Sequence, residues 1–189
     1  MKKLFVFAAM AAFALTSCDK GPAGENNGPV EGDYTKLVFN ELCGAGEDVD
    51  KFVELYNNGD VELSLEGVTI EKDGGDLSWT GKATDKIAAK SVFLIQGTKN
   101  STPNGLSTGF SSKKTVLMEL SDPDGNIIDT FQRGEADPTA AEPWGATLDA
   151  NPGSWSRVPD GTGKFLQTTA TTPGAVNATE GTEDATLVQ

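Results

Sequence analysis

Short apolar runs alternating with turn-forming residues make up most of the chain from residue 36 onward. In the run over residues 51–57, Phe52, Glu54 and Tyr56 fall on one side of an extended chain, whereas Val53 and Leu55 fall on the other. This period of two is typical of a β-strand. The same reasoning predicts strands over residues 36–42, 61–65, 68–71, 77–79, 91–96, 115–120 and 126–131.

The segments between these runs predict turns and loops, because no stretch of ten or more residues shows a helical period with a capping residue. Asn58-Gly59 favours a type I′ hairpin turn, and Asp122-Pro123-Asp124-Gly125 predicts a second hairpin. Residues 97–108 and 134–151 are expected to form long loops. Short strands at this spacing predict a sandwich or barrel, and the continuous apolar run 91–96 predicts a strand buried on both faces.

The first 17 residues have the pattern of a lipoprotein signal peptide. Lys2 and Lys3 precede an apolar stretch over residues 4–15. A helix needs about 20 residues to cross a bilayer, so we interpret this shorter stretch as a signal-peptide core. Leu15-Thr16-Ser17-Cys18 is similar to a bacterial lipobox. The similarity implies cleavage before Cys18 and its acylation, by palmitate or a related chain, so that the membrane would be a partner through the N-terminal lipid.

Polar, glycine-rich sequence flanks the strand-rich region on both sides. Residues 18–34 hold too few apolar side chains to offset the entropy of ordering, and are expected to form a flexible tether. Residues 179–189 are acidic and show no periodicity, and are expected to be disordered. A single domain is therefore predicted over residues 35–178.

The composition excludes several kinds of function. The chain has 15 basic and 28 acidic residues, a net charge of −13; loss of residues 1–17 removes two lysines and leaves −15. Such a chain would repel nucleic acid. It contains no histidine, which excludes a His-based catalytic triad and His-ligated metals. With Cys18 acylated, Cys43 has no intramolecular disulfide partner and is expected to be a buried thiol.

The order of short motifs resembles the lamin tail domain (LTD) family from about Leu37 to Asn177. One departure from the family pattern is Val68, which stands where Trp is common, and Glu66 is an extra residue before the glycine. The segments that carry the resemblance are Val38–Glu41, Asp50–Asn57, Val61–Ile70, Ile87–Ile95, Asp122–Asp129, Ser154–Gly163 and Thr172–Asn177.

The resemblance implies a fold and a kind of role, but no reaction mechanism. The implied fold is all-β, an immunoglobulin-like β-sandwich of the LTD type. Bacterial members are regarded as binding or attachment modules, and the chain resembles outer-membrane lipoproteins of Bacteroides-like bacteria that face the periplasm or the cell surface. We therefore expect an accessory module without catalytic residues or cofactor. It would contact a glycan, a peptide or an outer-membrane protein complex through loops at one end of the sandwich, and no nucleic acid.

Trp144 is the candidate ligand-binding residue. It lies in the predicted loop 134–151, where an exposed aromatic ring can stack on a sugar or a peptide. Trp79 and Trp155 lie in strand-like segments and are expected to belong to the core. The loop hypothesis also includes residues 97–108, so that both loops would contribute to one contact surface.

Two alternative functions follow from acidic residues. Asp122, Asp124 and Asn126 have the spacing of the first ligands of a calcium loop, although Ile127 and Arg133 occupy the positions that an EF-hand needs for Gly and Glu. A hairpin turn is the simpler interpretation, and a calcium-stabilised surface domain is the alternative.

The second alternative is a carboxylate-dependent hydrolase, which could be metal-assisted and would use Glu41 and Glu54 as a catalytic pair. Strand alternation gives no reason to place these two side chains in a shared cleft. Glu54 and Arg157 also belong to the family motifs, so we favour a structural ion pair or capping of the backbone.

Overall fold

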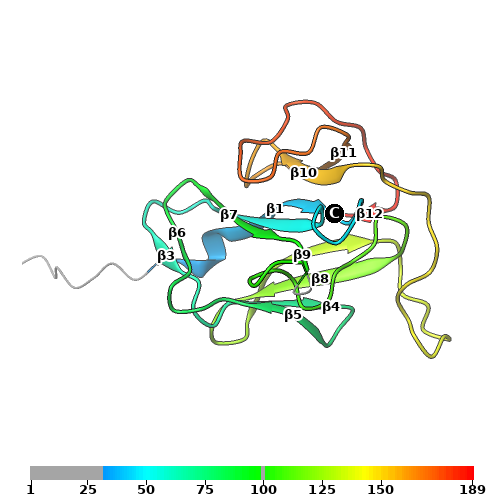
Figure 1. The fold of residues 1–189 in the computed structure, drawn as a ribbon, viewed down its shortest axis with the longest axis horizontal. Helices are drawn as coiled ribbons and strands as arrows, with labels where there is room; N and C mark the ends of the chain where they lie inside the picture. The colour runs from blue at the N-terminus through cyan, green and yellow to red at the C-terminus, as the bar shows by residue number, and fades with distance from the viewer. Residues whose placement is uncertain (1–31, 99–100) are drawn as a thin grey trace, which may run out of the picture. The chain divides into compact units, whose positions relative to one another are not determined.

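The computed structural model describes residues 32–98 and 101–189, which form a β-sandwich of two five-stranded sheets (Figure 1). All pairings between the strands are antiparallel. The first sheet has the order β11 (Lys164–Thr168), β10 (Ser154–Val158), β1 (Leu37–Cys43), β2 (Phe52–Asn57) and β7 (Val92–Gln96). The second has the order β12 (Leu187–Val188), β9 (Ile127–Arg133), β8 (Val116–Ser121), β4 (Thr69–Lys72) and β5 (Asp76–Thr80). A small third sheet pairs β3 (Leu63–Ser64) with β6 (Lys86–Ile87). The predicted all-β sandwich is therefore confirmed.

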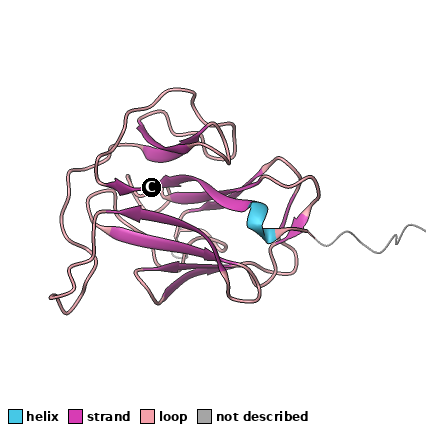
Figure 2. Ribbon diagram, turned by 180° about the vertical axis from the view of Figure 1, so that it is seen from behind, coloured by secondary structure: helices cyan, strands magenta, loops and turns pink. Residues whose placement is uncertain are grey.

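The only helical segment in the described residues is one 3-10 turn, η1 (Tyr34–Lys36), drawn in cyan in Figure 2. The Asp33 carboxylate caps it by accepting a hydrogen bond from the Thr35 amide, and the Tyr34 hydroxyl donates to the Ser64 carbonyl at 2.8 Å. The last residues of the expected tether thus belong to the folded domain. Residues 1–31, which include the predicted signal peptide and Cys18, lie outside the described residues. Within the described part, no helix has the length and apolar character that crossing a bilayer requires.

One hydrophobic core fills the space between the sheets. Trp155 of β10 and Phe131 of β9 come from opposite sheets, and their ring centroids are 5.4 Å apart. Phe165 packs edge-on against Phe131 at 5.1 Å. Trp155 has no exposed surface and Trp79 is 7% exposed, so both indoles belong to the core as predicted. Each fully buried side chain of this kind stabilises the fold by about 1.5–3 kcal/mol.

The prediction that residues 91–96 form a strand buried on both faces was wrong. This run forms β7, which pairs only with β2 and ends the first sheet. Ile95 is buried, but Val92, Phe93 and Leu94 are partly exposed. An apolar run indicates that a segment packs against the core. It does not distinguish a central strand from an edge strand that is covered on one face.

The predicted hairpin at Asn58-Gly59 is also absent. Strand β2 pairs with β1 and β7, and neither Asn58 nor Gly59 has the positive φ that a type I′ turn needs. The turn is built instead by the Asn57 side chain, which accepts a hydrogen bond from the Gly59 amide and donates one to the Val61 carbonyl, each at 2.8 Å. A side chain that bonds to backbone two to four residues further on replaces the hairpin geometry here.

The C-terminal segment is ordered, contrary to the prediction for residues 179–189. Leu187 and Val188 form β12 on the edge of β9. Thr182 and Gln167 exchange backbone hydrogen bonds of 2.8 and 2.9 Å, and the Gln189 side chain bonds to both the amide and the carbonyl of Phe165. Polar contacts to two sheet edges order this segment, and hydrophobic periodicity does not report such contacts.

Candidate functional site: a cleft beside Trp144

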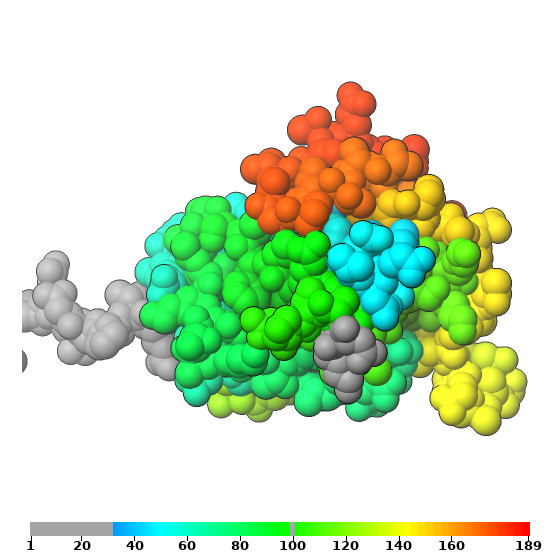
Figure 3. Space-filling view, in the orientation of Figure 1, coloured from blue at the N-terminus to red at the C-terminus, as the bar shows by residue number. Residues whose placement is uncertain are grey.

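An open cleft of about 1010 Å³ lies at one end of the sandwich, where Trp144 is found. One wall is the loop that follows β9, drawn in yellow in Figure 3, where it stands away from the body of the domain. The opposite wall is the β4–β5 hairpin, and the segment leading into β8 forms the floor. The lining residues include Lys51, Lys72, Asp73, Gly74, Gly75, Asp76, Phe110, Lys114, Thr115, Asp137, Glu142, Pro143, Trp144 and Gly145.

Backbone pairing holds the Trp144 loop against the start of β8. The Thr115 amide donates to the Ala146 carbonyl at 2.8 Å, and the Thr115 hydroxyl accepts from the amides of Gly145 and Ala146. Lys114 and Thr147 form an antiparallel bridge. Gly145 has φ +96, a conformation that L side chains rarely adopt. The backbone of the loop is therefore fixed directly after Trp144.

The hairpin wall ends in a type I′ turn. Asp73 and Gly74 have φ values of 57° and 79°, the two consecutive positive values that define this turn. The Asp73 amide donates to the Leu117 carbonyl at 2.8 Å, and its carboxylate accepts from the Leu117 amide at 3.1 Å. These contacts attach the turn to β8, the strand that directly follows the floor of the cleft.

The described residues of the 97–108 loop do not line this cleft, so the structure separates the two loops of the sequence hypothesis. The described part of this loop lines a smaller pocket of about 230 Å³ with Pro103, Asn104, Gly105 and Ser107, next to Trp79. Its Ser107 hydroxyl donates to the carbonyls of Leu77 and Ser78 on the free edge of β5. The loop therefore covers a sheet edge, a role that differs from the wall formed by the Trp144 loop.

Glu41 and Glu54 lie side by side, which strand alternation did not predict. A register shift in β1 between Phe39 and Glu41 makes them partners across β1 and β2. Both are fully buried. The Glu41 carboxylate accepts from the Thr172 amide and hydroxyl, and the Glu54 carboxylate accepts from the Gly174 amide at 2.7 Å. The two carboxylates thus cap the backbone of one loop, which agrees with the capping role we favoured.

The same cluster includes residues from four separate motifs. The side-chain nitrogen of Asn40 donates to Glu54 at 2.8 Å and to Asp160 at 3.1 Å, and its side-chain oxygen accepts from the Gly161 amide. The Asn177 side chain donates to the backbone carbonyl of Asn40 at 3.2 Å. Burial, opposed by the bonds from Asn40 and Gly174, raises the pKa of Glu54 to about 7. Four of the seven segments that carry the family resemblance therefore meet in one buried polar cluster.

Arg157 forms an ion pair, but its partner is Asp129 and not Glu54. Its guanidinium contacts both carboxylate oxygens of Asp129 at 2.9 and 3.0 Å, and it also donates to the carbonyls of Phe39 and Gly163. Asp129 accepts a further bond from the Phe39 amide. This pair joins β10 to β9, so it links the two sheets.

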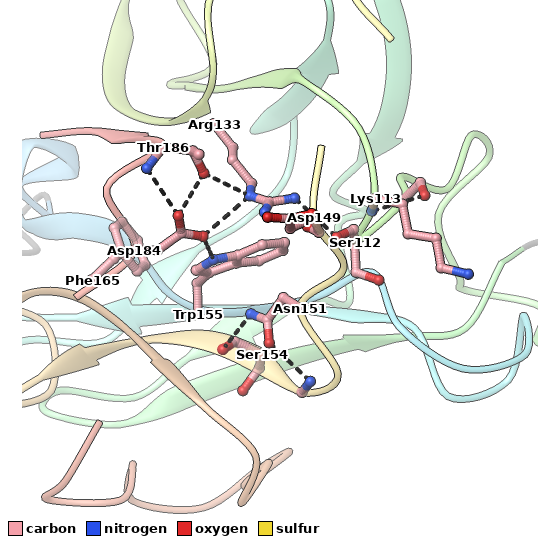
Figure 4. A network of polar contacts seen from close by, with 12 residues as sticks. Ser112, Lys113, Arg133, Asp149, Asn151, Ser154, Trp155, Phe165, Asp184 and Thr186 are labelled. Carbon is pink, nitrogen blue, oxygen red and sulfur yellow. Dashed lines mark hydrogen bonds and ion pairs between the residues drawn. The ribbon is translucent and has the colours of Figure 1, made fainter. Parts of the chain in front are cut away.

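A second buried ion pair was not predicted at all. Arg133 lies 3.2 Å from Asp184, and their side chains are only 3% and 7% exposed. Figure 4 shows the guanidinium over the Trp155 indole, whose nitrogen donates to the same Asp184 carboxylate at 2.9 Å. Arg133 also donates to the carbonyls of Ser112 and Asp149. Asp184 lies in the segment expected to be disordered, so no local pattern indicated this contact.

The calcium candidates lie in the confirmed β8–β9 hairpin. The Asp122 carboxylate accepts hydrogen bonds of 2.9–3.0 Å from the amides of Asp124 and Asn126 and from the Asn126 side chain. The turn itself thus uses the oxygens that a cation would need. Within residues 32–98 and 101–189, no group of three or more His, Cys, Asp or Glu side chains has the arrangement of a metal site. Cys43 is buried, as expected, and burial raises the pKa of its thiol.

A comparison with family models places the fold in a known group. The model of the Lamin Tail Domain family matches residues 32–135, more than half of the chain. No curated protein matches the sequence. The match ends before β10 and β11, yet these strands complete the first sheet beside β1. The chain belongs to the lamin tail domain family.

Proposed function

We propose that the protein is a non-catalytic binding module of the bacterial cell envelope, anchored by lipid at Cys18, that holds its ligand in the Trp144 cleft. The observation that carries this proposal is the cleft itself: a partly buried indole faces an open space of about 1010 Å³ on a loop that the scaffold fixes in place. Concave sites with an aromatic wall and a few polar groups are typical of ligand binding.

The proposed cellular location rests on the N-terminal sequence. A signal-peptide core followed by a lipobox-like Cys18 favours attachment to a membrane, and the resemblance to Bacteroides-like lipoproteins favours the outer membrane, with the domain facing the periplasm or the cell surface. The net charge of −15 that remains after loss of residues 1–17 would keep the domain away from anionic lipid surfaces and nucleic acid. The partner would be a glycan, a peptide or an outer-membrane protein complex.

The contacts of the acidic residues disfavour the two alternatives, a carboxylate-dependent hydrolase and a calcium-stabilised domain. A hydrolase that uses Glu41 and Glu54 would need substrate to reach them, whereas both are fully buried and accept bonds from the Thr172 and Gly174 backbone. A calcium site at Asp122 would have to displace the hydrogen bonds of the turn. Binding through the cleft is thus the function that the geometry supports best.

The test is capture from solubilised outer membranes by the immobilised mature chain. Trp144→Ala should reduce the captured amount by about tenfold, because it removes the aromatic contact. Ile127→Ala is the matched control: Ile127 is 58% exposed, but it is the first residue of β9 and does not line the cleft. Both variants should unfold at the temperature of the native protein. Equal capture by the native chain and Trp144→Ala would refute the role of the cleft.

A further inference from the structure

The charged side chains of the Trp144 cleft largely neutralise one another. Lys72 lies 3.7 Å from Asp73 and 3.9 Å from Asp76, and Lys51 lies 3.1 Å from Asp48. The Asp137 carboxylate is used by its own turn, where it accepts from the amide and hydroxyl of Thr139. The lining therefore presents many hydrogen-bond donors and acceptors without a strong field of either sign. Such a lining matches a ligand that carries both kinds of group and no net charge.

The apolar side chains that line the cleft differ in their exposure. Phe110 and Val116 are buried in the floor, with 4% and 2% of their surface exposed, whereas Trp144 is partly buried and Pro143 is exposed. A Cβ added at Gly74 would meet no atom within 4 Å, so the tip of the hairpin wall borders open space. Peptide recognition commonly uses pockets that enclose apolar side chains, whereas a partly exposed indole in an open cleft suits the face of a sugar ring.

We infer that the ligand of this cleft is a neutral, hydroxyl-rich carbohydrate chain. This inference rests on the proposed function and names the ligand class for the same site. Stacking on Trp144 would supply the apolar contact, and the side chains of Lys114 and Glu142, which are exposed on the rim, would exchange hydrogen bonds with hydroxyl groups. The cleft is open, so the interior of a long chain could lie in it as well as an end. An anionic polymer is disfavoured by the net charge of −15 of the mature chain.

The test is isothermal titration of the full mature chain with defined probes. These are neutral hexasaccharides of the glucan, xylan and mannan types, a hexagalacturonate as the anionic sugar, and an acidic and a basic peptide. At least one neutral hexasaccharide should bind. Its affinity should change by less than about twofold between about 0.05 and 0.5 M salt, since screening acts on charge pairs and not on stacking.

Variants connect the measured binding to the cleft. Trp144→Ala should weaken binding of the neutral hexasaccharide by about tenfold or more, and Trp144→Phe, which keeps a ring, should restore part of it. Ile127→Ala should bind like the native chain. Circular dichroism and thermal unfolding of each variant would show that a loss of binding is not a loss of folding.

Each other outcome contradicts a specific statement. Binding of only the hexagalacturonate or a peptide, lost in Trp144→Ala, would overturn the carbohydrate inference and leave the cleft as a binding site. Binding of a hexasaccharide that is unchanged in Trp144→Ala would overturn the cleft itself. If no neutral hexasaccharide binds, the inference fails, and the capture experiment with outer membranes decides separately whether the proposed function survives.

Discussion

At the scale of the residue, this domain contains buried polar contacts between distant positions that the local sequence does not predict. Arg133 and Asp184 are separated by about 50 positions, and their side chains meet over the Trp155 indole. Removing one member of a buried pair leaves the other charge without compensation, which costs more than the pair itself contributes. The contact therefore makes a long-range connection that is sensitive to single substitutions.

We expect Arg133→Met to lower the free energy of unfolding by about 3–5 kcal/mol, because Asp184 would stay buried without its partner. The matched control is Lys164→Met, which removes an ion pair with Glu183 whose side chains are 55% and 75% exposed. That change should leave stability unaltered within error. Urea unfolding followed by tryptophan fluorescence measures both. Similar losses in the two variants would contradict the importance of burial.

Glu54 gives the domain a pH dependence whose sign follows from its pKa. In the folded protein this pKa is raised from 4.5 to about 7, mainly by burial, with further contributions from the Glu41 and Asp160 carboxylates. The folded state thus keeps a proton that the unfolded state loses above its own pKa. The stabilisation from this group is complete below pH 4.5, and is lost as the pH rises through about 7.

Stability should therefore fall between pH 5 and pH 8 by an amount on the order of 2 kcal/mol from this residue. Glu54→Gln has no proton to lose, so the variant should not show this loss. Its unfolding free energy relative to that of the native chain should therefore rise between pH 5 and pH 8. Urea midpoints at a series of pH values measure that difference. A difference that is independent of pH would show that Glu54 does not titrate there.

At the scale of the element, the sequence was informative about strands and much less so about their partners. The β8–β9 hairpin was predicted correctly, because Pro123 and Gly125 define a turn whose strands are adjacent in the chain. The Asn58-Gly59 prediction failed because β2 pairs with β1, which precedes it, and with β7, whereas β3, which follows the turn, pairs with β6. Trp144 was assigned to a loop, but the hairpin that faces it could not be inferred. Such pairings depend on the whole fold and not on local pattern.

The type I′ turn at Asp73-Gly74 offers a test of the hairpin that forms the cleft wall. Gly74 has φ +79, whereas its neighbour Gly75 does not have a positive φ, and a Cβ at either position would meet nothing within 4 Å. Gly74→Ala should therefore lower the unfolding free energy by about 1–2 kcal/mol through backbone strain alone. Gly75→Ala should be close to neutral. Equal effects in thermal unfolding would exclude strain as the cause.

At the scale of the whole molecule, the sandwich needs both halves of the chain. The family match covers residues 32–135, but Asn40 in β1 bonds to Asp160, Gly161 and Asn177 in the second half. The segment after Asn177 extends this closure. It pairs with β11 of the first sheet through Thr182 and with β9 of the second sheet through β12. The C-terminal segment thus joins the edges of the two sheets on one side of the sandwich.

Deleting residues 183–189 tests this closure. The deletion removes β12, the bonds of Gln189 to Phe165 and the carboxylate that compensates Arg133, so the unfolding free energy should fall by at least about 3 kcal/mol. Urea unfolding of the deletion variant and of the full chain measures the loss, with Glu183→Ala as the control within the same segment. A disordered tail would give no loss. If the deletion and Arg133→Met are combined, their effects should not add, because both remove the same buried pair.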